Sequence, residues 1–160
     1  MLTPYPLKTI DNLSFEFVTH AGITYKIYFL KASHLFADYQ QIKCPVYEIN
    51  FIPIDGNPFN NISDQKIGAT IQLVLSLFFE NIRNVAIYVC ESLDNRQIAR
   101  KRKFDAWFDL YNNGSFIKEN GTAYIDGDII FNSILIHKQN EQIHELIRAF
   151  RDLNEKIDRK

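Results

Sequence analysis

The chain has 160 residues, of which 46% are hydrophobic and 14% aromatic, and its formal net charge is −1. A chain of this length can bury a core of its own without disulfides or a structural metal. The small net charge excludes a general attraction to nucleic acid or anionic lipid, so any basic surface must be local. No apolar run is long enough to cross a bilayer, and we expect no membrane contact.

Cysteine and histidine usage predicts neither disulfides nor a metal site. Cys44 and Cys90 lie far apart and lack C-x-x-C spacing, which favours reduced thiols. The histidines are scattered without the spacing of metal ligands. The N-terminus shows no charged region followed by an apolar core, so it does not read as an export signal. We therefore expect a cytoplasmic protein.

The first half of the chain predicts strands followed by a helix. Residues 1–13 show no periodicity and predict an extended lead-in, and residues 14–157 predict a single α+β domain. Aromatic and β-branched runs predict a hairpin and a third strand, at residues 14–19, 23–30 and 46–54. A helix capped by Ser63 or Asp64 should follow. Its buried stripe would hold Ile67, Ile71, Val74, Leu75 and Phe78, widened by Leu73, Leu77 and Phe79.

The second half predicts a strand at 85–90, a helix at 96–111, a hairpin and a final helix at 140–160. Asp126-Gly127 predicts a type I′ turn between hairpin arms 116–125 and 128–137, with Asn120-Gly121 as a competing turn. The predicted order is β-β-β-α-β-α-β-β-α. It indicates an α+β fold on a mixed, mostly antiparallel sheet, with parallel pairing only across the 46–90 crossover.

A line of cations and aromatic residues marks the helix at 96–111. At 3.6 residues per turn the line contains Arg96, Arg100, Lys103, Trp107 and Tyr111. The cations continue the aromatic stripe, so we expect them to point toward whatever the helix packs on. As a site, the line could hold an anionic ligand, with nucleic acid or a protein partner as alternatives. The alternative is a purely structural role, in which Arg96 and Arg100 would pair with inward carboxylates and their alkyl stems would cover the sheet edge. Lys101 and Arg102 are expected to face water.

The start of the earlier helix is a second candidate site. Gly68 stands where a helix should already be established, which costs about 1 kcal/mol relative to Ala. Close approach of a phosphate to the free amides is one reason for a glycine there. Close packing of the helix on the sheet is the other.

The order of elements from residue 14 to 137 resembles the later two-thirds of the GNAT acyltransferase fold. That family carries Q/R-x-x-G-x-G/A at this helix, and Gln65-Lys-Ile-Gly68-Ala-Thr70 matches its first two fixed positions. The resemblance implies that the amides of Lys66, Ile67, Gly68, Ala69 and Thr70 receive the pyrophosphate of acetyl-CoA or another acyl-CoA. It also implies that backbone around Phe51 and Ile52 pairs with the pantetheine arm. Glu48 would be the general base, and Asn95 would stand at the start of the second helix.

A longer resemblance covers residues 90–108. The segment carries C-x-S-x-D-x-R-Q-x-x-R-x-R-K-F-x-x-W-F. It is similar to the core of a small, uncharacterised family of bacterial domains, and this resemblance implies no activity. The acyltransferase pattern is incomplete, since the third helix-start position and the family's catalytic Tyr are missing. We therefore expect a non-catalytic binding or accessory module of GNAT-like topology, with an acyl-CoA-dependent N-acyltransferase as the alternative.

Overall fold

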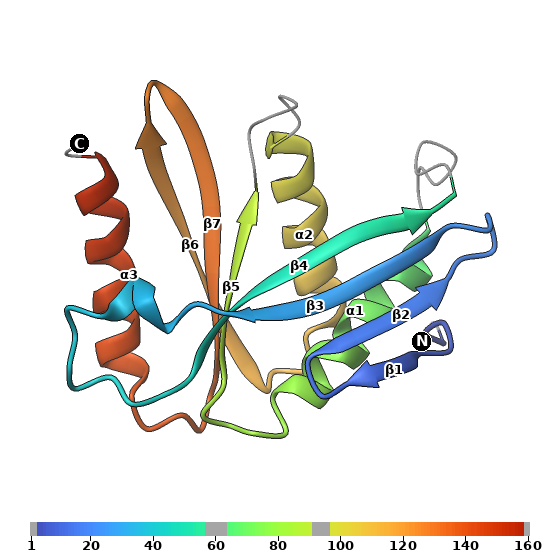
Figure 1. Ribbon diagram of the computed structural model, residues 1–160, viewed down its shortest axis with the longest axis horizontal. Coiled ribbons are helices and arrows are strands. Elements are labelled where there is room, and N and C mark those ends of the chain that lie inside the picture. The colour runs from blue at the N-terminus through green and yellow to red at the C-terminus, as the bar shows by residue number, and fades with distance from the viewer. Residues whose placement is uncertain (1–2, 57–63, 91–96, 159–160) are drawn as a thin grey trace.

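The computed structural model describes residues 3–56, 64–90 and 97–158. Seven strands form one sheet in the order β1-β2-β3-β4-β5-β7-β6 (Figure 1). The strands are β1 (Lys8–Asp11), β2 (Ser14–Val18), β3 (Thr24–Lys31), β4 (Val46–Asp55), β5 (Val85–Cys90), β6 (Phe116–Ile125) and β7 (Asp128–His137). The helical elements are the 3₁₀ helix η1 (Ser33–Phe36) and the helices α1 (Gln65–Phe78), α2 (Gln97–Tyr111) and α3 (Ile143–Asp158).

The predicted α+β class and mixed sheet are confirmed. Described strand pairs are antiparallel except β4 and β5, which are parallel, as predicted for the 46–90 crossover. One strand, β1, was not predicted, because it lies inside the segment expected to be a lead-in. That segment also packs on the domain: Tyr5 is 3% exposed, and its amide donates to the hydroxyl of Thr70 at 2.9 Å.

The last hairpin follows its predicted turn. Ile125 pairs with Asp128, and both turn residues have positive φ, 50° at Asp126 and 84° at Gly127. These dihedrals fit the type I′ turn, whose twist matches that of the strands. The competing turn does not form, since Gly121 lies within β6 opposite Asn132. A Cβ at Gly121 would lie 2.5 Å from the side chain of Asn154 on α3, so this glycine allows α3 to approach the sheet.

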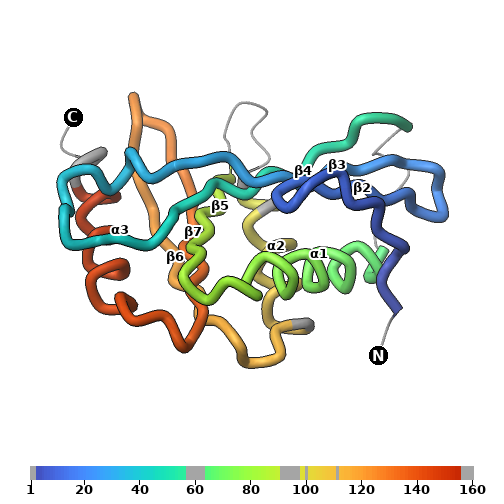
Figure 2. The backbone as a smooth tube through the Cα atoms, turned by 60° about the horizontal axis from the view of Figure 1, so that its bottom comes forward, coloured from blue at the N-terminus to red at the C-terminus, as the bar shows by residue number. Residues whose placement is uncertain are grey.

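Helices cover the two faces of the sheet unequally. α1 and α2 pack on one face, and α3 lies on the opposite side of the β6–β7 hairpin from α2 (Figure 1). Figure 2 shows α1 and α2 beneath β2, β3 and β4. Successive side chains of β5 point to opposite faces of the sheet and so contribute to two cores. Ala86 belongs to the core under α1 and α2, whereas Val85 and Ile87 belong to the core under α3.

The stripe predicted for α1 is buried, with Ile67, Ile71, Val74, Leu75 and Phe78 all in the core. Two residues that were expected to widen this buried stripe lie at the surface instead, since Leu73 is 36% exposed and Leu77 is 37% exposed. The buried arc is therefore narrower on this side than the sequence suggested. Among the described helices, none has the length and apolarity needed to cross a lipid bilayer.

Strands β4 and β5 start together and then diverge (Figure 1). They pair from Val46 opposite Val85 to Ile49 opposite Tyr88, after which β4 pairs with β3 and β5 with β7. The carbonyl of Val46 in β4 accepts a hydrogen bond from the amide of Ala32, the residue after β3. The carbonyl of Pro45, the residue before β4, accepts one from the amide of Val85 in β5. Because backbone groups alternate along a strand, the main-chain N–H and C=O of Phe51 face the opening between the diverging strands.

Candidate functional site

Of the three cations on the predicted line, Lys103 is the one whose side chain the structure describes. Lys103 is exposed, with its ammonium 5.2 Å from the centroid of the Trp107 ring. The expectation that Lys103 points inward is therefore wrong, because a lysine can lay its stem beside the Trp107 ring and keep its ammonium in water. Arg96 lies outside the described residues, as do the side chains of Arg100 and Tyr111.

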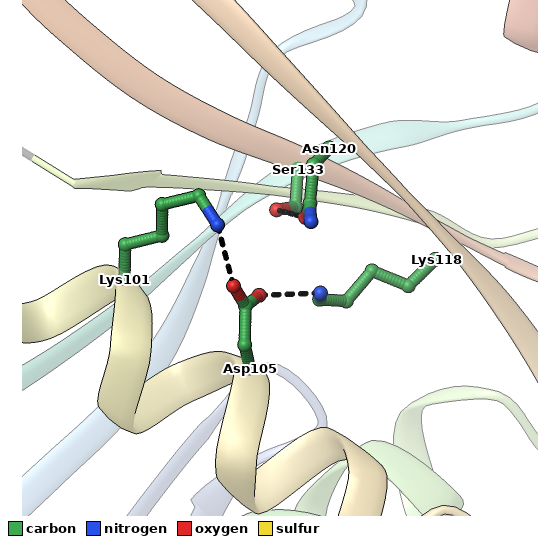
Figure 3. Close-up of polar contacts among 5 residues, drawn as sticks. All are labelled: Lys101, Asp105, Lys118, Asn120 and Ser133. Atoms are coloured by element: carbon green, nitrogen blue, oxygen red, sulfur yellow. Dashed lines mark hydrogen bonds and ion pairs between the residues drawn. The ribbon is translucent and has the colours of Figure 1, made fainter. Parts of the chain in front are cut away.

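Among the α2 cations whose side chains the structure describes, Lys101 lies toward the last hairpin. We expected Lys101 to face water, but its Nζ lies 2.6 Å from Oδ2 of Asp105 one turn along the helix. Nζ of Lys118 on β6 lies 2.5 Å from the other carboxylate oxygen of Asp105. Figure 3 shows the two ammonium groups approaching this carboxylate from the helix and from the hairpin.

This three-residue cluster is partly shielded from water. The side chain of Lys118 is 8% exposed, that of Asp105 24% and that of Lys101 31%. Burial on its own raises the pKa of the Asp105 carboxyl, but hydrogen bonds from Lys101 and Lys118 outweigh burial and hold the pKa below its ordinary value. Asp105 is therefore ionised at neutral pH. Within this cluster of described residues, two positive charges face one negative charge.

Aromatic rings and neutral polar groups surround the cluster. The ammonium of Lys118 lies 5.2 Å from the ring centroid of Phe108, and that of Lys101 lies 5.8 Å from that of Phe131. Both distances are within the range of cation–π attraction. Nearby, Ser133 donates to the side-chain oxygen of Asn120 at 2.7 Å (Figure 3). The cluster thus combines cations with hydrogen-bonding side chains, which suits an anion.

Sequence reasoning missed Asp105 and Lys118. The spacing of Lys101 and Asp105 was a usable signal, because residues four apart are neighbours on a helix surface. Lys118 gave no such signal, since only the packing of the hairpin against α2 brings it to Asp105.

Aromatic side chains fill the opening between β4 and β5 on the side of α2. Trp107 is half-buried and meets the Phe51 ring edge-on at 6.1 Å, while Phe104 stacks on Tyr88 at 4.0 Å. The cavity left among these rings measures about 10 Å³. Such a space holds one water molecule at most.

The start of α1 is capped by its own chain. Asp64 accepts a hydrogen bond from the Lys66 amide at 2.9 Å, as predicted for an N-cap, and a second from the hydroxyl of Tyr5. Lys66 places its ammonium 4.6 Å from the Tyr5 ring centroid. Thr70 donates to the carbonyl of Lys66 at 2.6 Å. Tyr5 and Asp64 thus occupy the place where a phosphate was expected.

The other residues predicted to receive pyrophosphate are buried in α1. They are Ile67, Gly68, Ala69 and Thr70. Gly68 lines a space of about 10 Å³ together with Phe104 and Trp107 of α2. Gly68 is therefore closely packed, and the residues of α2 are its neighbours across this space.

Glu48 lies on the other face of β4. Its neighbours in the strand, Tyr47 and Ile49, belong to the core under α1 and α2, so the Glu48 side chain points away from both helices. Glu48 is half-buried, between Leu30 of β3 and Ile87 of β5. Asn95 lies outside the described residues. Among described His, Cys, Asp and Glu residues, no group of three could hold a metal ion.

One protein family matches the part of the chain that holds α1, β5, α2, the last hairpin and most of α3. A family model matches residues 63–152, more than half of the chain. The chain belongs to DUF6169, a family of unknown function. Membership in an uncharacterised family was predicted and is confirmed. No curated protein and no solved structure matches the chain.

The DUF6169 match includes the whole of α2 and all three members of the Lys101–Asp105–Lys118 cluster. It leaves out strands β1 to β4, and with them Glu48 and Phe51. The candidate anion site therefore lies within the segment that defines the family.

Proposed function

We propose that this chain is a non-catalytic binding module with a GNAT-like topology, and that its basic helix α2 holds an anionic ligand. The observation that carries the proposal is the sharing of Asp105 by Lys101 and Lys118, which in the described part of the chain sets two positive charges against one negative charge in a partly buried position. An anion placed there would complete the charge balance at a site already shielded from water.

The rest of α2 adds to this positive field. Lys103 and Arg102 are exposed on the same helix, and the Lys103 ammonium lies beside the Trp107 ring. Arg96 and Arg100 belong to the proposed site through their place on the predicted line. Trp107 and Tyr111 would supply ring surface to a ligand that also carries a flat group. A phosphate-bearing ligand fits both features.

The GNAT-like topology is supported by the sheet. Its order ends in β4-β5-β7-β6, and the parallel pair β4–β5 is joined through α1 and separates after Ile49 and Tyr88. Three antiparallel strands, a helix, a strand, a helix and a hairpin follow the order that the resemblance implies.

The capping of α1 favours a module over an enzyme. Asp64 already binds the Lys66 amide, and its negative charge would repel a pyrophosphate at the same helix start. Moreover, Phe51 and Trp107 fill the space beside the opening between β4 and β5. A ligand entering there must displace these rings.

One observation favours N-acyl transfer from acyl-CoA as a second candidate. The main-chain N–H and C=O of Phe51 face the opening beyond the last pair of β4 and β5, where an extended arm could bond to them. In that case Glu48 would act as base, and the amides of Lys66 to Thr70 would bind pyrophosphate after Asp64 moved away.

Thermal unfolding with two probes separates the candidates. Tripolyphosphate at a hundred times its dissociation constant should add ~2.7 kcal/mol to the free energy of unfolding. If the chain is a binding module, tripolyphosphate and acetyl-CoA should stabilise it to a similar extent. About 0.5 M salt should then weaken both effects. Stabilisation by acetyl-CoA alone would favour the acyltransferase. The absence of a shift with either probe would contradict both proposals.

A further inference from the structure

A cavity of about 720 Å³ opens at the C-terminal end of α1. Its walls come from the turn between β1 and β2, from β4, from the last turn of α1 and from the loop that leads to β5. The described lining includes no residue of α2, so the cavity is separate from the proposed anion site. Its volume lies within the ~300–1,000 Å³ typical of small-molecule sites.

One wall of the cavity is apolar and firmly packed. Phe78 stacks on Phe29 with ring centroids 4.1 Å apart and planes 3° from parallel. Tyr47 meets Phe78 edge-on at 5.6 Å. Leu77, on the same turn of α1, is 37% exposed. The rings are fixed by the core, so this wall exists before a ligand arrives, and the exposed part of Leu77 is available to cover an apolar group.

The lining also carries negative charge where α1 ends. The C-terminus of a helix carries a partial negative charge, and α1 has no basic residue in its last turn to offset it. Glu80, two residues beyond Phe78, adds a full negative charge, and it is the one charged residue among the described lining. Asn84 donates through its side-chain nitrogen to the carbonyl of Phe78 at 2.9 Å. Its side-chain oxygen is the atom that can accept from a ligand.

We propose that this cavity binds a small organic amine in its ammonium form. The ammonium group would lie between the Glu80 carboxylate, the end of α1 and the side-chain oxygen of Asn84, all of which attract or accept from N–H donors. The apolar part of the amine would lie against Leu77 and Tyr47. The ligand of this cavity is thus opposite in charge to the ligand proposed for α2.

The test is a calorimetric titration of the full chain with 2-phenylethylamine and with 2-phenylethanol, which differ in charge and little in shape. The amine should bind saturably at millimolar concentration and the alcohol about tenfold or more weakly. Glu80→Gln should weaken amine binding by about tenfold, whereas Glu141→Gln, an exposed charge outside the described lining, should leave it unchanged.

A second variant guards against a nonspecific loss of binding. Leu77→Lys puts a cation into the cavity from a position that is already exposed, so the domain should fold and amine binding should be lost. Equal binding of amine and alcohol would overturn the proposal. So would equal binding by wild type and Glu80→Gln, retention of binding in Leu77→Lys, or the lack of any saturable binding.

Discussion

Lys118 on β6 and Asp105 on α2 form an ion pair that ties the basic helix to the last hairpin. The same carboxylate holds Lys101, so one acidic residue organises two cations from different elements. This arrangement links α2 to the sheet, and among the described residues it brings two cations to one carboxylate.

Asp105→Asn should lower the free energy of unfolding at pH 7 by ~1–3 kcal/mol, because the nearly buried Lys118 ammonium would lose its charged partner. Urea unfolding at pH 7 measures this loss. Asp109→Asn, an exposed position on the same helix, should change stability by less than ~0.5 kcal/mol. A similar loss in both variants would show that the ion pair is not the cause.

Acid should remove the stability that Asp105 contributes. The pKa of Asp105 is lower in the folded chain than its ordinary value, so the contribution is complete above that ordinary value, ~3.9, and is lost as pH falls through the folded pKa. The gap between wild type and Asp105→Asn should therefore close at acidic pH. A gap of constant size from pH 7 to pH 3 would contradict the pairing.

Gly121→Ala should destabilise the chain by ~1–3 kcal/mol through overpacking. The added Cβ would lie 2.8 Å from a ring carbon of Phe150 and closer still to Asn154, both on α3. Thermal unfolding measures the effect, with Thr122→Ala as the matched change at the exposed neighbouring position. An unchanged melting temperature in Gly121→Ala would show that α3 packs less closely on β6.

Trp107→Ala should cost ~2–3 kcal/mol, below the ~3–5 kcal/mol typical of a fully buried aromatic residue, because Trp107 is half-buried against Phe51. Chemical denaturation followed by circular dichroism gives the value, since the variant lacks the single tryptophan of the chain. A cost near zero would mean that Trp107 is only a surface platform.

Tyr39 should lose its proton only at unusually high pH. Its hydroxyl donates to Asp152, and this hydrogen bond, with burial and the nearby charge, raises the pKa of Tyr39 to about 12. Because the folded pKa is raised, the stabilisation is complete below pH ~10 and is lost as pH rises toward 12. Ultraviolet titration of Asp152→Asn should show one tyrosine that ionises at lower pH than it does in wild type. Identical titration curves would rule out the hydrogen bond.

Elements with a clear local pattern could be predicted from the sequence. The buried stripe of α1 repeats at the helical period, and Asp126-Gly127 has the residue types of a type I′ turn. Strand β1 could not be predicted, because all four of its residues are exposed and show no alternation. Its pairing to β2 depends on backbone hydrogen bonds, which leave no trace in residue type.

The orientation of one cation on α2 was predicted wrongly, since Lys103 is exposed. The helical wheel placed Lys103 on the line of Trp107, yet it could not show that Lys101 would pair with Asp105 beside the hairpin. The contact of Asp105 with Lys118 could not be read from the wheel, because Lys118 comes from a strand after α2 in the chain. Likewise, Asp64 was a predictable cap, whereas its contact with Tyr5 joins residues far apart in the sequence.

The most direct test of anion binding by α2 is a tripolyphosphate titration followed by the fluorescence of Trp107, the only tryptophan. The double variant Lys101→Gln/Lys103→Gln removes one cation from the Asp105 cluster and one from the predicted line. It is compared with Lys8→Gln/Arg148→Gln, which removes the same charge from exposed positions on β1 and α3. We predict saturable binding by wild type and by the second variant, and at least about tenfold weaker binding by the first. Equal weakening in both variants, or no saturable change in wild type, would contradict the account.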